Sequence, residues 1–109
     1  MDDKIKDVFL QVQEDAEQCG SAFAETALEL FSDDETELGN FVDRLFDFYY
    51  VADNRQIIDY LILLGDVYGI PLSLEIKAYK TDDYKADVFI PIFLETFFYV
   101  VLATVGDAN

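Results

Sequence analysis

The sequence contains no histidine, a single cysteine and only seven lysines and arginines among its 109 residues. Without histidine the chain has no Ser–His or Cys–His nucleophile pair, no zinc site of the usual kind and no Glu-x-x-His di-iron motif. The five glycines are isolated from one another, and none belongs to the Gly-Lys-Ser or Gly-Lys-Thr of a phosphate-binding loop. We therefore expect a protein that is not an enzyme and that carries no metal and no cofactor.

Carboxylates are abundant, but their spacing matches no ligand loop or catalytic pair. A calcium loop with Gly39 at its sixth position would place Asp34 first, Thr36 third and Leu38 fifth. Leu38 breaks the pattern, because the fifth position has to supply an oxygen ligand. Acid–base catalysis by two carboxyl groups needs a cleft that separates their pKa values, and no pair in the sequence stands apart from the rest.

The single cysteine and the N-terminus both bear on location. Cys19 cannot form a disulfide within the chain, which fits a reducing compartment, and it falls among the apolar positions of the first expected helix. We expect it to be a small buried residue rather than a reactive thiol. The N-terminal MDDKIKDVF lacks the cationic run and apolar stretch of a secretory signal, so a cytoplasmic location is expected.

Hydrophobic residues make up 52% of the chain, with ten phenylalanines and seven tyrosines. Disordered acidic tails lack aromatic and large aliphatic residues, so this composition indicates a folded protein. A chain of this length suffices for one hydrophobic core and is short for two. We expect residues 1–109 to form a single domain with the acids on its surface.

The charge balance is strongly acidic, with 23 aspartates and glutamates and a net charge of −16. Repulsion at this density lowers the stability of the free protein, and solubility alone needs a magnitude of only about 2 to 8 in a small domain. A high-salt cytoplasm also favours acidic chains, although such chains have fewer large hydrophobic residues. Residues 1–66 hold 17 acids and 4 bases, and residues 67–109 hold 6 and 3. We favour an acidic surface that faces a basic partner.

The first third of the chain has the pattern of two amphipathic helices. Apolar residues recur at spacings of three and four over residues 2–18, which predicts a helix capped by Asp2 or Asp3. Gly20 is expected to end this helix. The same spacing over residues 23–31 predicts a second helix.

Two further helices are indicated by their start and stop residues. Ser32 and Glu35 form an S-x-x-E capping box, followed by the apolar stripe of a third helix over residues 38–49. Asp53 is the expected cap of a fourth helix, and Gly69 its expected end.

The C-terminal third has two interpretations. Residues 72–79 alternate apolar and polar side chains as a half-buried strand would, and with the turn-like KTDD that follows, residues 72–90 could form a hairpin. Pro71 and the pair Leu72 and Ile76 fit a short helix equally well. The following stretch VFIPIFLETFFYVVLATV is apolar on nearly all sides and has to be buried. If Asp87 caps a helix to Val105, Pro91 falls in its first turn, where its missing N–H costs nothing.

The fold class follows from these segments. We expect an all-α protein, a compact bundle of five to six helices around a buried C-terminal helix. The alternative is an α+β fold with a C-terminal hairpin, because the last segment is rich in β-branched and aromatic residues. A membrane span is not expected, since Glu95 interrupts the apolar stretch and no lysine or arginine follows it.

Carboxylates recur at helical spacing opposite the apolar stripes of the expected helices, with few lysines to compensate them. Tyr50 and Tyr60 lie off those stripes beside acids, and tyrosine is frequent at binding hot spots because it offers a large contact area and a hydroxyl. Alternatively, these acids are a solvated surface and the tyrosines pack against the C-terminal segment. The candidate partner-binding residues are Asp33, Asp34, Glu37, Asp43, Asp47, Tyr50, Asp53, Asp59 and Tyr60.

The run SDDETEL, continued by FVDRLFDF and the tyrosine pair of FYYVADN, resembles bacterial immunity proteins that neutralise nuclease toxins. The likeness covers residues 28–54 and is one of character. In the helical immunity proteins of colicin DNases, an acidic helix and a neighbouring tyrosine pair form the toxin-binding surface. The resemblance implies that role for Asp33, Asp34, Glu37, Asp43, Asp47 and Tyr50. Here the tyrosine pair continues the helix, and contact-dependent-inhibition immunity proteins fit equally well.

The function expected from the sequence is therefore that of an immunity or inhibitor protein. Its partner would be a basic protein, a nuclease toxin or another nucleic-acid enzyme, with no direct binding to nucleic acid or membrane. One alternative is a nucleic-acid mimic of the anti-restriction or anti-CRISPR kind, because carboxylates one helical turn apart are spaced about as phosphates are, roughly 5–6 Å. Another is a structural subunit without catalytic activity.

Overall fold

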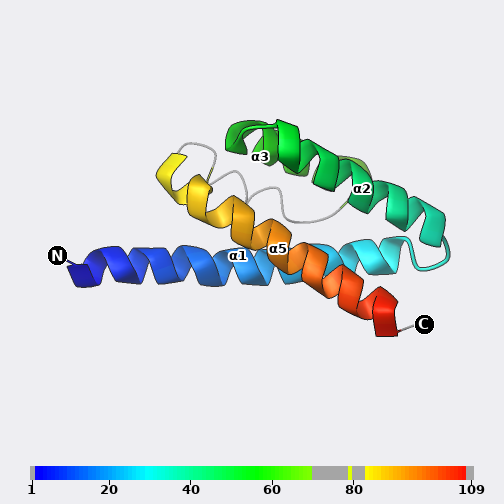
Figure 1. Cartoon of the computed structure of the whole chain (residues 1–109), viewed down its shortest axis with the longest axis horizontal. Coiled ribbons are helices and arrows are strands. Elements are labelled where there is room, and N and C mark those ends of the chain that lie inside the picture. The colour runs from blue at the N-terminus through cyan, green and yellow to red at the C-terminus, as the bar shows by residue number, and fades with distance from the viewer. Residues whose placement is uncertain (1, 70–78, 80–82, 108–109) are drawn as a thin grey trace.

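A computed structural model of the chain describes residues 2–69, 79 and 83–107, and these residues form four helices and no strand (Figure 1). The helices are α1 (Asp2–Leu30), α2 (Glu35–Val51), α3 (Asn54–Tyr68) and α5 (Asp83–Asp107). α5 crosses α1 and also packs on α3, and α2 contacts both α1 and α5 through the ring of Phe41 (Figure 1). The all-α class is confirmed for the described residues, and the expected five to six helices are not matched.

The helix count differs because α1 runs without a break through Gly20, where the sequence predicted an end. Gly20 is buried at the place where α1 and α5 cross. A Cβ atom on Gly20 would lie 2.6 Å from the carbonyl oxygen of Phe93 and 3.1 Å from the Cβ of Thr96. The glycine is thus explained by the close approach of two helix backbones, and the two helices expected over residues 2–31 are one.

The predicted N-terminal cap is wrong for α2 and confirmed for α3. α2 begins after Asp34, whose carboxylate accepts a hydrogen bond from the backbone N–H of Glu37 at 3.0 Å, so the predicted Ser32 capping box is wrong. Aspartate is as good an N-cap as serine, and Asp34 directly precedes the first residue of α2, whereas Ser32 lies two residues further away. Asp53 caps α3 as predicted, in a reciprocal capping box with Gln56.

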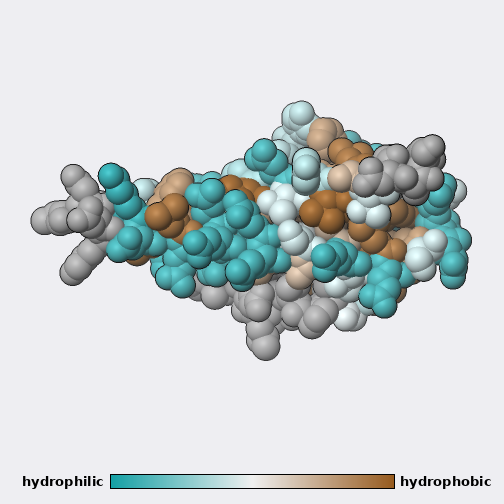
Figure 2. All heavy atoms as spheres, turned by 90° about the horizontal axis from the view of Figure 1, so that it is seen from below, coloured by the Kyte–Doolittle hydropathy of each residue, from teal (hydrophilic) through white to brown (hydrophobic). Residues whose placement is uncertain are grey.

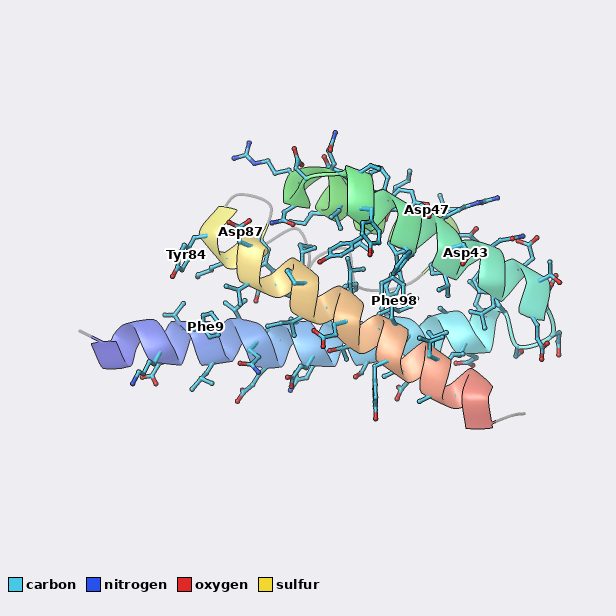
Figure 3. All side chains as sticks on the ribbon, in the orientation of Figure 1. Phe9, Asp43, Asp47, Tyr84, Asp87 and Phe98 are labelled. Atoms are coloured by element: carbon cyan, nitrogen blue, oxygen red, sulfur yellow. The ribbon has the colours of Figure 1, made fainter. Side chains whose placement is uncertain are left out.

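Both ends of α3 follow the sequence pattern. Gly69 ends the helix in the left-handed conformation with a φ of 72°, which glycine adopts without the steric cost of a Cβ atom. At the start of α3, the side-chain amide of Asn54 donates a hydrogen bond to the carboxylate of Asp87 in α5. This contact ties the beginning of α3 to the beginning of α5 (Figure 3).

The core combines aliphatic residues of all four helices with a group of phenylalanine rings from α1, α2 and α5. Phe23 of α1 lies with its ring centroid 5.6 Å from that of Phe93 and 5.3 Å from that of Phe97, both with the edge of one ring toward the face of the other. Phe97 reaches α2 through Phe41, at 6.2 Å between centroids. One side of α5 is therefore buried over most of its length, whereas Tyr84, Tyr99 and Leu102 are exposed, so α5 is not enclosed on nearly all sides as the sequence predicted.

The start of α5 differs from its prediction. The helix begins at Asp83 and not after Asp87, so Pro91 lies inside the helix and not in its first turn. A proline there removes one backbone hydrogen bond, and Pro91 is half-buried rather than fully enclosed. Residues 83–90 are helical, which excludes them from the alternative hairpin over residues 72–90. Residues 72–78 and 80–82 of that alternative lie outside the described residues.

By length and composition, α5 would be able to cross a membrane: its segment Tyr84–Thr104 has a mean hydropathy of 1.9. In the structure, 39% of this segment is buried against the other helices. The core helix of a globular protein meets the same criterion, and the phenylalanine contacts of α5 account for the apolar character of its buried side.

The crossing of α1 and α5 predicts opposite effects for two glycine substitutions. Gly20→Ala should lower the free energy of unfolding by about 1–3 kcal/mol, because the new methyl group meets backbone atoms of α5 that have no room to move. Gly39→Ala should raise it by about 0.5–1 kcal/mol, because Gly39 is an exposed position inside α2 with no atom within 4 Å of a new Cβ. Urea unfolding followed by circular dichroism measures both. A stabilising Gly20→Ala would contradict the close crossing.

Candidate functional site

One exposed side of α2 combines acidic and aromatic side chains. Phe46 and Asp47 stand three and four positions after Asp43 and four and three positions before Tyr50, so the four residues share one side of the helix. The buried stripe of Leu38, Phe41 and Leu45 faces the core instead. All four exposed residues come from the segment that resembles immunity proteins.

The aromatic residues of this side form a connected cluster with α5. The ring centroids of Phe46 and Tyr50 are 5.0 Å apart with an angle of 65° between the ring planes, and Phe46 lies 5.6 Å from Phe98 of α5. Phe98 in turn contacts the buried Phe97 at 5.4 Å. The cluster is thus anchored in the core at one end, and it reaches solvent at the other.

We refer to Asp43, Phe46, Asp47 and Tyr50 of α2 together with Phe98 of α5 as the acid–aromatic face. Figure 3 shows Phe98 in the space between α2 and α5, with Asp43 and Asp47 on α2. Phe46 is 45% exposed and Tyr50 is 73% exposed, although apolar rings of this size are usually buried. In the part of the chain that the structure describes, the carboxylates of Asp43 and Asp47 form no hydrogen bond or ion pair.

Two of the predicted site residues, Asp34 and Asp53, act as helix caps. The carboxylate of Asp34 accepts the N–H of Glu37, and that of Asp53 accepts the N–H of Gln56 at 2.9 Å. Both side chains are exposed, so a partner has access to them, but each carboxylate is already engaged. They lie at the two ends of α2, outside the acid–aromatic face.

The remaining predicted residues are distributed around the molecule. Asp33 is exposed in the turn between α1 and α2, and Glu37 lies about 120° around α2 from Asp43 by helical geometry. Asp59 is exposed on α3. Tyr60 is half-buried with its ring 4.5 Å from that of Phe48, so it packs between α2 and α3. The structure therefore brings together Asp43, Asp47 and Tyr50 of the nine predicted residues.

Sequence reasoning missed the two phenylalanines of this face. Phe46 has the spacing that would have revealed it, since it stands three residues after Asp43 and four before Tyr50, off the buried stripe. Phe98 had no such signal, because its segment is apolar on all sides and only the packing of α5 shows which residues meet α2.

A second group of exposed apolar residues lies far from this face. Val8, Phe9 and Leu10 are 45–54% exposed on the end of α1 that projects beyond the other helices (Figures 1 and 3). Figure 2 shows hydrophobic atoms at this end, while hydrophilic side chains cover much of the neighbouring surface of α1. Phe9 has the same exposed fraction as Phe46, 45%, and therefore serves as a matched control for it.

Comparisons with protein-family models, with curated proteins and with solved structures found no match for this chain. Among the described residues, no group of three or more histidine, cysteine, aspartate or glutamate side chains is arranged to hold a metal ion. The acid–aromatic face offers negative charge, ring surfaces and the hydroxyl of Tyr50 for contact with a partner.

The two roles of the aspartates predict different effects on stability. Asp53→Ala should lower the free energy of unfolding by about 1 kcal/mol, because it removes the capping box of α3. Asp47→Ala removes the same charge from an exposed helix position and should change stability by less than about 0.5 kcal/mol. Thermal and urea unfolding of the two variants measure both changes. Equal losses of unfolding free energy would contradict the assignment of Asp53 as a helix cap and of Asp47 as an exposed carboxylate without a structural role.

Proposed function

We propose that this chain is an immunity or inhibitor protein that uses the acid–aromatic face to bind and block a basic partner protein, a nuclease toxin or a related nucleic-acid enzyme. The observation that carries the proposal is the exposed ring cluster of Phe46 and Tyr50 with Asp43 and Asp47 beside it. The resemblance of residues 28–54 to nuclease-toxin immunity proteins points to the same helix.

The composition of the face supports binding to a protein. Protein interfaces place aromatic side chains in the centre, where they lose contact with water, and polar or charged groups around them. Phe46 and Tyr50 provide such a centre, and the contact with Phe98 holds Phe46 in place before a partner arrives. Rings that are already positioned lose less conformational freedom on binding, which favours affinity.

The net charge of the chain supports a basic partner. A charge of −16 creates a negative potential around the whole molecule, which accelerates encounter with a basic protein and repels acidic ones. Nucleases and other nucleic-acid enzymes are basic where they bind phosphates. Covering that surface would block substrate access without any chemical step by this chain.

The same arrangement distinguishes this proposal from nucleic-acid mimicry. A mimic would need rows of carboxylates in place of the phosphates, whereas aromatic rings occupy two positions of the α2 stripe. Exposed rings between single acids fit the side chains of a protein surface better than they fit a channel built for a phosphate backbone. We therefore retain the inhibitor as the proposed function.

Affinity capture with a charge-matched pair of variants tests the proposal. Asp43→Asn with Asp47→Asn removes two charges from the face, and Asp7→Asn with Glu14→Gln removes two from exposed positions of α1. The native chain and the α1 variant should capture the same basic protein from the source cell, and the face variant should bind it at least about tenfold more weakly.

The captured partner then has to be purified and assayed. The native chain should abolish its nuclease activity at equimolar concentration, and the face variant should inhibit only at about tenfold higher concentration. If both double variants bind and inhibit as the native chain does, the acids of α2 have no special role and the proposal fails.

A further inference from the structure

The ring and carboxylate positions of the acid–aromatic face specify more than positive charge in a partner. Tyr50 is 73% exposed, and its ring meets that of Phe46 at 65°, so the two rings form an open corner and are not stacked face to face. Asp47 lies one turn before Tyr50 in the sequence of α2, and Asp43 lies one turn before Asp47. Ring faces and carboxylates are therefore within one side chain's length of each other.

Arginine is the side chain that uses both kinds of group. Its planar guanidinium stacks on an aromatic ring and donates two parallel hydrogen bonds to a carboxylate, and it is weakly hydrated. The ammonium of lysine carries the same charge, but it is compact and strongly hydrated, and it gains less from a ring face. A face built from carboxylates alone would distinguish the two cations less, because it lacks the ring surface on which a guanidinium stacks.

We propose that the acid–aromatic face is an arginine-selective binding site, which takes an exposed arginine of the basic partner. The guanidinium lies against the ring of Tyr50 or Phe46 and donates to Asp47 or Asp43. The inference rests on the proposed function and names the side chain by which the partner is held.

The chain itself leaves this position open. Arg44 is the only cation of α2, and in the part of the chain that the structure describes it forms no ion pair with Asp43 or Asp47. By helical geometry Arg44 lies about 100° around α2 from Asp43, on the side away from Phe46. Arg44 stands three positions before Asp47 and is within reach of it, so Asp43 with the rings of Phe46 and Tyr50 is the part of the face that an incoming guanidinium meets without a competing cation from α2.

Two blocked peptides of equal length and charge, Gly-Ser repeats with four arginines or with four lysines, test the selectivity. Binding to the whole chain is measured by calorimetry, and NMR shifts of the Tyr50 and Phe46 ring protons locate the site. The arginine peptide should bind about twofold to fivefold more tightly, the range expected from a cation–π contact at an exposed site. Its titration should shift the ring protons of Tyr50.

Variants assign the selectivity to the rings. Tyr50→Leu, alone and with Phe46→Leu, should bring the arginine peptide to the affinity of the lysine peptide, and Phe9→Leu should leave the preference unchanged. Tyr50 is so exposed that its substitution does not threaten the fold, which circular dichroism verifies. Asp43→Asn with Asp47→Asn should weaken both peptides more than Asp7→Asn with Glu14→Gln does.

The outcomes separate this inference from the proposed function. If the two peptides bind with equal affinity, and the Asp43 and Asp47 substitutions weaken their binding most, arginine selectivity is overturned. The proposed function, binding of a basic partner at this face, then still stands. A preference that survives the loss of both rings also overturns arginine selectivity at this face. If the two charge-matched double variants weaken both peptides equally, the face is no binding site, and the inference and the proposed function fall together.

Discussion

The crossing of α1 and α5 at Gly20 is the contact on which the rest of the structure depends. Only glycine at position 20 leaves room for the backbone of α5 at Phe93. The close approach brings Phe93 and Phe97 onto Phe23, and Phe97 extends the same ring packing to Phe41 of α2. Since Phe98 adjoins Phe97 and contacts Phe46, the position of the acid–aromatic face is set by this crossing.

The distribution of charge explains how so acidic a chain folds around this core. The acids lie mainly on α1, α2 and α3, where every one of them that the structure describes is exposed or half-buried. α5 carries the apolar surface that these helices share. Repulsion among the acids opposes folding, and burial of the phenylalanine rings offsets it. A partner that neutralises some of the charge would relieve this repulsion, so binding and stability are linked.

The sequence was sufficient for some of this arrangement and not for the rest. Periodicity and end signals identified the helical class, the cap at Asp53 and the end at Gly69, because these depend on neighbouring residues. The prediction for Gly20 was wrong, because the sequence does not distinguish a glycine that ends a helix from one that lets a second helix approach closely. The acidic and tyrosine half of the face followed from helical register, whereas Phe98 depended on how α5 packs, which no local pattern encodes.

The exposed rings of the face have a cost in the free protein that bears on their role. Burial of Phe46 and Tyr50 would stabilise the free protein, yet the core is complete without them, since Leu38, Phe41 and Leu45 already fill the inner side of α2. Solubility does not account for them either, because aromatic residues reduce it and the acids alone supply it. Rings kept in water beside carboxylates that form no bond among the described residues are best explained by a partner that covers both together. An arginine-bearing surface satisfies both requirements with one side chain.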